Sequence, residues 1–268
     1  MKIGFYTFSY IDILSMPYRP VLDSIAEAGY DGVDLSATKG RTTSPEHFPP
    51  AERSELRRYA ESLGLEVCIA ITHEHLTTTI EQGRPMDLKG FVDVALDLGA
   101  DSLGVHVGPA RGSPRRQRHL WEQTTSALRD ASAYAAERGV LIALTTIWPG
   151  DLLDTTDQML RMVEEVGAEN LRCYYDPGFL LLMGLDPRSE ARRMGDLIAH
   201  VHVKDCEGRH PDYRMHIPGE GRLDLASTLG VLDEIGYDRY ISIETFSTHP
   251  FERACFSGYK AVAGALQT

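Results

Sequence analysis

The feature that most constrains this chain is a repeated alternation of short apolar stretches with longer amphipathic ones. The short stretches are rich in Ile, Val and Tyr, and each is paired with a segment whose apolar residues recur at helical spacing. Eight such pairs can be drawn along the chain. This rhythm is typical of βα units, in which successive strands run parallel.

The predicted elements can be placed by residue number. The predicted strands are Lys2–Ser9, Gly32–Leu35, Glu66–Thr72, Ser102–Val107, Leu141–Thr146, Arg172–Asp176, His200–Lys204 and Tyr240–Glu244. The predicted helices are Val21–Ala28, Ala51–Leu63, Leu88–Leu98, Arg118–Arg138, Thr156–Val166, Ser189–Leu197, Leu225–Ile235 and Phe251–Leu266. Glycines follow most of these helices, at Gly29, Gly64, Gly99, Gly139, Gly167 and Gly236. Because a left-handed glycine commonly closes a helix, these positions support the count.

Eight parallel strands with short connections favour a closed (β/α)8 barrel, the TIM barrel, because closure leaves no sheet edge unpaired. A length of 268 residues suits one such barrel, and no Pro-, Gly- or Ser-rich linker divides the chain. Residues 1–268 are therefore predicted to form a single α/β domain. The alternative is an open doubly wound sheet. It is disfavoured because no G-x-G-x-x-G motif follows the first predicted strand.

Charge and composition limit the partners. The chain has 27 Lys and Arg against 39 Asp and Glu, and a net charge of -12 would repel nucleic acid. No apolar stretch is long enough for a membrane span, and the first residues do not resemble a signal peptide. The four cysteines form no C-x-x-C pair. We expect a cytoplasmic protein that binds a small molecule, without nucleic acid or membrane partners, and a homo-oligomer is compatible with the sequence.

Ionisable residues gather near the ends of the predicted strands, where catalytic groups of TIM barrels lie. They are His73 and Glu74 after the third strand, His106 in the fourth, Asp176 ending the sixth, His200, His202 and Lys204 in the seventh, and Glu244 ending the eighth. Taken singly, each could be a satisfied core residue or a helix cap. Alternation, however, places the three polar residues of the seventh strand on one face, where they need partners or a metal.

Asp176, His202 and Glu244 offer two carboxylates and one imidazole. Such a set suits a divalent metal ion: Mn²⁺, Mg²⁺, Co²⁺, Zn²⁺ or Fe²⁺. The residue types do not select among these ions.

Three motifs carry a family resemblance. They are His200-Val-His202-Val-Lys204-Asp205, the later segment Pro218-Gly219-Glu220-Gly221-Arg222-Leu223-Asp224, and the final Ile243-Glu244. Together they resemble the sugar phosphate isomerase/epimerase family, or xylose isomerase-like TIM barrels, which includes tagatose 3-epimerase-like enzymes, inosose dehydratase and endonuclease IV. The resemblance implies metal ligands on strands 5 to 8, and it assigns Asp176, His202 and Glu244 to three of them.

The chain departs from that family pattern at two positions. Thr145 stands where the family has the strand-5 Glu, so a fourth metal position would pass to water, to substrate or to nothing. Phe179 stands where many relatives have His, which makes the mouth of the barrel more apolar. With Arg214, these two residues occupy places where endonuclease IV has metal ligands, so phosphodiester cleavage is disfavoured.

The resemblance also bears on the reaction. Epimerases of the family use two carboxylates, from strands 5 and 8, on opposite faces of a ketose, and here only Glu244 remains. We therefore predict one-base chemistry: a proton leaves the carbon beside a carbonyl, and then either a proton returns on the same face or a hydroxyl is lost. The predicted activity is that of an isomerase, epimerase or lyase acting on a sugar, inositol or related polyol.

Further residues receive expected roles in this chemistry. His106, His73, Glu74 and Lys204 are candidates for the missing acid, and Lys204 and His106 are expected to contact substrate rather than metal. The expected substrate-binding residues are His73, Glu74, Thr145, Trp148, Arg214 and His216. The last two precede the Pro-Gly-Glu-Gly segment, on what we expect to be a lid-like loop.

Two alternatives stay open at this point. Thr145 would also suit a metal-poor pseudoenzyme or the partner subunit of an active enzyme. A tailoring enzyme of a natural-product pathway would use Trp148, Phe179 and Phe246 as an aromatic pocket. Metal analysis of the purified protein separates the pseudoenzyme from the other readings.

Overall fold

The computed structural model describes residues 1–8, 18–37, 45–84, 86–145, 148–245 and 249–267. Eight parallel strands form a closed barrel in the order β1-β10-β7-β6-β5-β4-β3-β2. The strands are β1 (Lys2–Tyr6), β2 (Gly32–Ser36), β3 (Glu66–Ile71), β4 (Ser102–His106), β5 (Leu141–Thr145), β6 (Leu171–Tyr175), β7 (Ile198–Val203) and β10 (Tyr240–Ile243). The predicted TIM barrel is confirmed. Ser9 and Thr146, included in two predicted strands, lie outside the described residues.

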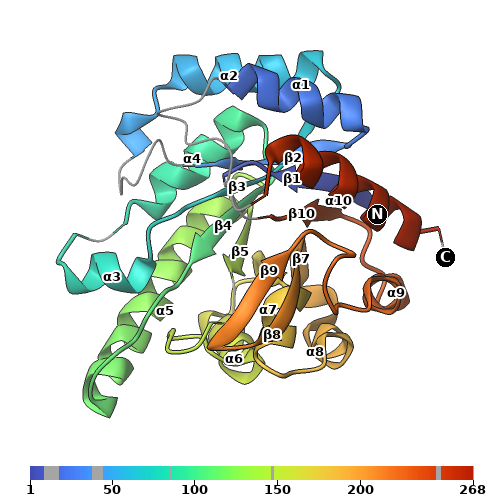
Figure 1. Ribbon diagram of the computed structural model, residues 1–268. Coiled ribbons are helices and arrows are strands. Elements are labelled where there is room, and N and C mark those ends of the chain that lie inside the picture. The colour runs from blue at the N-terminus through green and yellow to red at the C-terminus, as the bar shows by residue number, and fades with distance from the viewer. Residues whose placement is uncertain (9–17, 38–44, 85, 146–147, 246–248, 268) are drawn as a thin grey trace. The chain divides into compact units, whose positions relative to one another are not determined.

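The helices follow the predicted rhythm (Figure 1). They are α1 (Tyr18–Ala28), α2 (Pro50–Ser62), α3 (Leu76–Glu81), α4 (Leu88–Leu98), α5 (Pro114–Ala136), α6 (Thr156–Val166), α7 (Pro177–Leu182), α8 (Pro187–Met194), α9 (Leu225–Glu234) and α10 (Phe251–Ala265), with 3-10 turns at Pro45–His47 and Gly195–Leu197. All six glycines expected after helices have positive φ. The limits of α4 and α6 match the prediction.

Two short helices and a two-stranded hairpin were not predicted from the sequence. The helices α3 and α7 have only six residues each, too few for a helical period to be recognised. The strands β8 (Asp205–Arg209) and β9 (Asp212–His216) form an antiparallel hairpin, drawn in orange in Figure 1. Its residues are largely polar, so they lack the apolar alternation that identifies a half-buried strand.

The chain divides into two compact units. The first unit comprises Met1–Leu35, Arg58–Cys68 and Tyr175–Thr268. Within it, β1 pairs with both β10 and β2, and β10 pairs with β7, where Ser242 lies opposite His202. The helix α1 packs against α10, and α8 packs against α9.

The second unit comprises Ser36–Arg57 and Ile69–Tyr174. Within it, β4 pairs with β3 on one side and with β5 on the other, and β5 pairs with β6. The helix α4 packs against β4, and α5 packs against β5.

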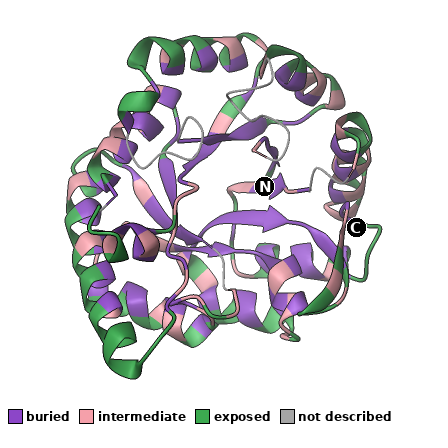
Figure 2. Cartoon of the chain, turned by 60° about the vertical axis from the view of Figure 1, so that its left-hand side comes forward, coloured by how far each residue is buried: buried purple, intermediate pink, exposed green. Residues whose placement is uncertain are grey.

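The strands are buried, and the helices are amphipathic. Figure 2 shows strands coloured almost throughout as buried, while each long helix has buried residues on one side and exposed residues on the other. Phe5 on β1 is fully buried and meets the rings of Tyr30 and Phe251 edge to face, at centroid distances of 5.4 and 5.8 Å. Polar residues on such strands therefore need a specific explanation. None of the described helices is both long and apolar enough to cross a lipid bilayer.

Candidate functional site

The predicted site residues fall into two groups, one in each compact unit. Asp176, His202, Lys204, Arg214, His216 and Glu244 belong to the first unit, and His73, Glu74, His106, Thr145 and Trp148 belong to the second. Each group is described within its own unit.

Lys204 lies at the centre of the first group. It directly follows β7, and its side chain is 1% exposed. Its Nζ is 2.7 Å from Asp176 Oδ2 and 2.5 Å from Glu244 Oε2. Glu244 Oε2 also lies 2.8 Å from Nδ1 of His202. The structure thus brings together the three residues predicted as metal ligands: the Lys204 ammonium joins Asp176 to Glu244, and Glu244 in turn contacts His202.

The local fold places Asp176 between β6 and α7. Its Oδ1 accepts a hydrogen bond of 3.0 Å from the backbone N–H of Phe179, so the side chain caps α7. Pro177 occupies the first turn, where no intrahelical N–H is needed. Because one oxygen caps the helix, the other is directed to Lys204.

The charges of Glu244, His202 and Lys204 stabilise one another, whereas burial raises the pKa of Asp176 despite the Lys204 ammonium. Burial alone would raise the pKa of Glu244, but the Lys204 ammonium and His202 lower it to about 2. Burial alone would lower the pKa of Lys204, but Asp176 and Glu244 outweigh it and raise that pKa above its usual value. Glu244 is therefore a carboxylate and Lys204 an ammonium at neutral pH.

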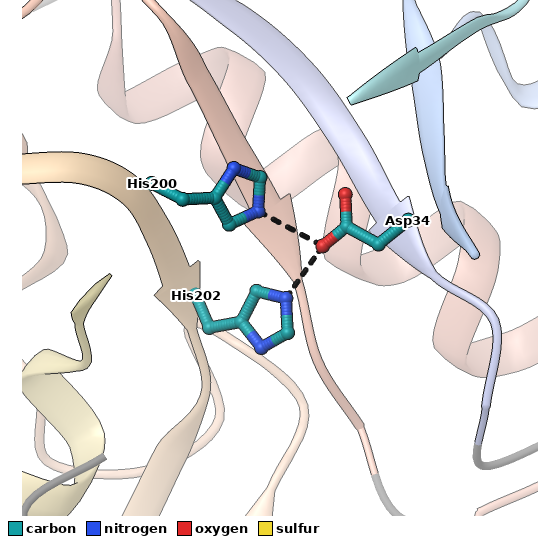
Figure 3. A group of neighbouring side chains, drawn as sticks. All are labelled: Asp34, His200 and His202. Carbon is teal, nitrogen blue, oxygen red and sulfur yellow. Dashed lines mark hydrogen bonds and ion pairs between the residues drawn. The ribbon is translucent and has the colours of Figure 1, made fainter. Parts of the chain in front are cut away.

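A third acidic residue of this unit, Asp34 on β2, was not predicted as part of the site. Its carboxylate is fully buried, and Oδ2 lies 2.9 Å from His200 Nε2 and 2.5 Å from His202 Nε2. Figure 3 shows both imidazoles directed at this one oxygen. The other oxygen, Oδ1, accepts a hydrogen bond of 2.7 Å from Ser242 Oγ on β10. Asp34 therefore satisfies the two histidines of β7 that the sequence predicted to need partners.

The two histidines differ in charge state. Burial lowers the pKa of His200 more than Asp34 raises it, so the pKa lies below its usual value. Burial would also lower the pKa of His202. The hydrogen bonds of His202 to Asp34 and Glu244 outweigh that effect, so the pKa of His202 lies above its usual value. Both ring nitrogens of His202 face carboxylate oxygens, and only the imidazolium can donate from both.

Asp34, His200 and His202 could themselves hold a metal ion. One ligand atom from each lies within 4.8 Å of the others, and all three side chains are buried. His202 is therefore shared between this set and the predicted set with Asp176 and Glu244; among the described residues, only the Asp34 set brings one donor atom of each member within 4.8 Å of the others.

A sequence signal for Asp34 existed. It is a charged residue in the middle of a short strand, between Val33 and Leu35, and all five residues of that strand are buried. Asp is depleted in strands, so an acid at such a position calls for a partner of opposite charge. His200 and His202 of the seventh predicted strand could therefore have been matched with Asp34 of the second predicted strand.

The predicted residues of the second unit have local partners. His106, at the end of β4, donates from Nδ1 to the Thr72 carbonyl oxygen at 2.5 Å, and its ring centroid lies 6.2 Å from that of His73. Thr145 is buried on β5, and its hydroxyl donates to the Val105 carbonyl oxygen at 3.3 Å. Glu74 and Trp148 are half-buried outside the strands and helices.

Arg214 and His216 lie on β9 of the hairpin, so the segment predicted as a lid-like loop is a strand. Arg214 is exposed, and His216 is half-buried with Nε2 3.6 Å from Glu207 Oε2. Substrate contact by either residue stays a prediction. Of the three aromatics proposed for an apolar pocket, Phe179 instead lies over Lys204, with its ring centroid 3.6 Å from Nζ. Phe246 lies outside the described residues.

Comparison with known proteins assigns this arrangement to a family. A family profile, Xylose isomerase-like TIM barrel, matches residues 22–262. The chain is 26% identical over 262 residues to L-ribulose 3-epimerase of Mesorhizobium japonicum, covering 92% of this chain and 82% of that protein. It is 24% identical over 267 residues to inosose dehydratase of Geobacillus kaustophilus, covering 87% of this chain and 83% of that protein.

Solved structures share the fold. D-psicose 3-epimerase from Clostridium cellulolyticum H10 superposes with a TM-score of 0.82 at 15% identity, covering 99% of both chains. The IolI protein, solved with a bound zinc atom, superposes with a TM-score of 0.79 at 20% identity, covering 100% of this chain and 98% of that one.

Proposed function

The chain belongs to the xylose isomerase-like TIM barrel family, and we propose that it transfers a proton at a carbon next to a carbonyl group. It is an enzyme of the sugar isomerase and epimerase type, as the names of its relatives indicate: L-ribulose 3-epimerase, inosose dehydratase and 2-oxo-tetronate isomerase. Ribulose, inosose and 2-oxo-tetronate each carry a carbonyl beside hydroxyl-bearing carbons. We therefore propose a small polyhydroxylated carbonyl compound as substrate.

The observation that carries this proposal is the convergence of Asp176, His202, Lys204 and Glu244. The buried carboxylate oxygen Oε2 of Glu244 lies 2.5 Å from the Lys204 ammonium and 2.8 Å from Nδ1 of the His202 imidazole. Such a set can take a proton from carbon, hold it and return it.

We propose that a divalent metal ion binds through Asp176, His202 and Glu244. Two observations support this set. The oxygens Asp176 Oδ2 and Glu244 Oε2 already converge on one cation, the Lys204 ammonium. His202 holds Asp34 through Nε2 and directs Nδ1 at Glu244. A carboxylate on the far nitrogen is the usual partner of a metal-binding histidine, because it fixes the ring and its tautomer.

The set formed by Asp34, His200 and His202 fits a metal less well. Asp34 is engaged at both oxygens, by Ser242 on one side and by the two imidazoles on the other. We therefore assign Asp34 an orienting role. Carboxylate and imidazole ligands suit Mn²⁺, Mg²⁺, Co²⁺, Zn²⁺ and Fe²⁺ alike, and Mn²⁺ is the first ion to test.

A divalent ion held by Asp176, His202 and Glu244 would supply polarisation of the substrate carbonyl, which would acidify the neighbouring C–H bond. Glu244 takes the proton from that carbon. The pKa of Glu244 is about 2 while Lys204 and His202 beside it are both charged. Movement of the Lys204 ammonium toward the substrate would raise the pKa of Glu244 and so make it a stronger base. Lys204 then donates a proton from Nζ to a substrate oxygen.

The proposed outcome is a one-base reaction. Thr145 carries no carboxylate, and its hydroxyl already donates to a backbone carbonyl. With Glu244 as the single base, the proton returns on the same face to the former carbonyl carbon while the neighbouring hydroxyl gives its proton back to Lys204, or a hydroxyl on the next carbon takes the Lys204 proton and leaves as water. The first course is an isomerisation and the second a dehydration.

Solvent isotope exchange tests the proposal without requiring net turnover. The protein is incubated with Mn²⁺ in D₂O with ribulose, fructose, tagatose and inosose, and deuterium at the carbon beside the carbonyl is measured by NMR. We expect exchange on at least one compound and at least a hundredfold slower exchange by Glu244→Gln. Glu234→Gln, an exposed acid on α9, serves as the matched control and should retain the parent rate.

Exchange by Glu244→Gln at the parent rate would remove Glu244 from the role of base. No exchange by the parent on any compound of the panel would contradict the proposed substrate class.

A further inference from the structure

Lys204 occupies a position built for a cation. Its ammonium is in contact with two carboxylate oxygens, at 2.7 Å from Asp176 and 2.5 Å from Glu244. The third neighbour is the face of the Phe179 ring, whose centroid lies 3.6 Å from Nζ. An aromatic face attracts a cation through its quadrupole but does not act as a metal ligand. These three contacts compensate the desolvation of a charge that is 1% exposed.

The stem of Lys204 is also fixed by packing. Gly178, in the first turn of α7, lies against it: a Cβ at Gly178 would be 2.5 Å from Lys204 Cγ and 2.6 Å from the Lys204 carbonyl oxygen. Any larger residue there would collide with the backbone of Lys204, directly after β7. The missing side chain therefore lets α7 approach Lys204 closely, and the position of Nζ follows from close packing around its stem.

The oxygens that hold this ammonium are those assigned above to a divalent ion. Asp176 Oδ2 and Glu244 Oε2 cannot keep the ammonium at hydrogen-bond distance and also hold a metal ion between them, because like charges at that separation repel strongly in a buried site. A metal ion must therefore displace Nζ.

We propose that Lys204 is an internal competitor for the metal site, and that its ammonium keeps the affinity of Asp176, His202 and Glu244 for divalent ions low. This inference rests on the ligand set of the proposed function. Without a metal ion, Lys204 balances the carboxylates and keeps the site folded. With one, the released ammonium is directed to an oxygen of the substrate.

Metal binding to Lys204→Met tests the competition, because methionine matches the length of the stem and carries no charge. Mn²⁺ binding to metal-free protein is measured by equilibrium dialysis and titration calorimetry. We expect Lys204→Met to bind one Mn²⁺ at least ten times more tightly than the parent, and its midpoint of thermal unfolding to rise more on addition of Mn²⁺. Lys260→Met, an exposed lysine on α10, is the matched control and should leave the affinity unchanged.

A Lys204→Met protein that folds only in the presence of Mn²⁺ would also support the proposal. If it folds under neither condition, Asp176→Asn is compared with the double variant Asp176→Asn/Lys204→Met, which preserves the net charge of the parent. The double variant should bind Mn²⁺ about ten times more tightly than Asp176→Asn.

Equal or weaker Mn²⁺ binding after removal of Lys204, in either background, would overturn the proposal. That result would leave the proposed function standing as long as the parent exchanges solvent deuterium. Conversely, tighter binding by Lys204→Met with no exchange by the parent would support the competition and contradict the proposed reaction.

Discussion

At Asp34, one carboxylate accepts hydrogen bonds from three side chains that lie 166 to 208 residues away in the chain. Burial would raise the pKa of this carboxyl, but His200 and His202 outweigh that effect and hold it well below its usual range. The negative charge fixes both imidazoles, and through His202 it fixes the direction of Nδ1 toward Glu244. One buried acid thus organises side chains of β7 and β10.

Asp34→Asn tests this role. The amide offers one acceptor oxygen in place of two, and it leaves Glu244 as the remaining carboxylate in contact with the buried imidazolium of His202. We expect the free energy of unfolding to fall by about 3 kcal/mol, measured by urea denaturation at neutral pH. Asp233→Asn, an exposed acid on α9, should change it by less than about 0.5 kcal/mol. A loss as small as that of the control would mean that Asp34 does not organise the cluster.

The stability of the protein should depend on pH through Asp151. Burial, with Asp154 nearby, raises the pKa of Asp151 to about 6, against the opposing effect of Arg111. The folded state therefore binds this proton more tightly than the unfolded chain, so stability falls as pH rises from about 4 to about 6. Above pH 6 the full cost of the buried carboxylate is present.

Asp151→Asn should remove that cost. We expect it to be more stable than the parent by about 1 kcal/mol at pH 7 to 8, after allowance for solvent screening, and equal to the parent below pH 4. Urea unfolding across this pH range measures the difference, with the exposed Asp130→Asn as control. A difference that is constant with pH would contradict the raised pKa.

Among the elements, the segment after the hairpin is held by one side chain. Oδ1 of Asp205 accepts from the backbone N–H groups of Cys206 and Leu223, at 2.8 and 2.9 Å. Its Oδ2 accepts from those of Gly219 and Gly221, at 3.0 and 2.9 Å. A Cβ at Gly221 would lie 2.3 Å from the carboxylate, so glycine is required for this approach. The Lys204-Asp205 motif and the Pro-Gly-Glu-Gly segment are thus two halves of one structural contact.

Asp205→Asn should release this segment. The amide nitrogen cannot accept hydrogen bonds, so two of the four backbone donors lose their acceptor. We expect a loss of about 3 kcal/mol in unfolding free energy and faster amide hydrogen exchange at Gly219 and Gly221. Asp212→Asn, an exposed hairpin residue, is the matched control. Unchanged exchange at both glycines would show that other contacts hold the segment.

For the molecule as a whole, closure of the barrel brings the first and last strands together. β1 pairs with β2 on one side and with β10 on the other, and β10 pairs with β7. This places Asp34 within hydrogen-bond distance of both Ser242 and His202. The cluster therefore depends on pairings between distant parts of the chain, which form only in the folded barrel.

The complete barrel also limits the reaction. Epimerisation at C3 of a ketohexose needs one group that removes a proton and a second that returns it to the opposite face. Glu244 is the proposed base, and Thr145 offers no carboxylate for the second role. We predict that the Mn²⁺-loaded protein forms no detectable C3 epimer from fructose or tagatose, as measured by chromatography. Efficient epimerisation would contradict the one-base mechanism, because a second proton-transferring group would then be at work.

The sequence by itself determined the architecture. Strand and helix rhythm, with a glycine after most helices, predicted eight βα units because backbone propensity and burial repeat locally with fixed periods. It also indicated Asp176, His202, Lys204 and Glu244 as a group, because the C-terminal ends of barrel strands lie at one end of the barrel. The short helix α7 and the polar hairpin escaped prediction because neither is long or apolar enough to show a period.

Only the tertiary structure decided which groups touch. Local patterns place a side chain on a face of its strand, but they do not say which residue of a distant strand lies opposite. Asp34 as the partner of both histidines, Asp205 as the anchor of four backbone N–H groups and the Lys204 ammonium between two carboxylates all depend on strand register and barrel closure. Register is set by packing over the whole barrel, and hydrogen-bond partners in the buried site follow from it.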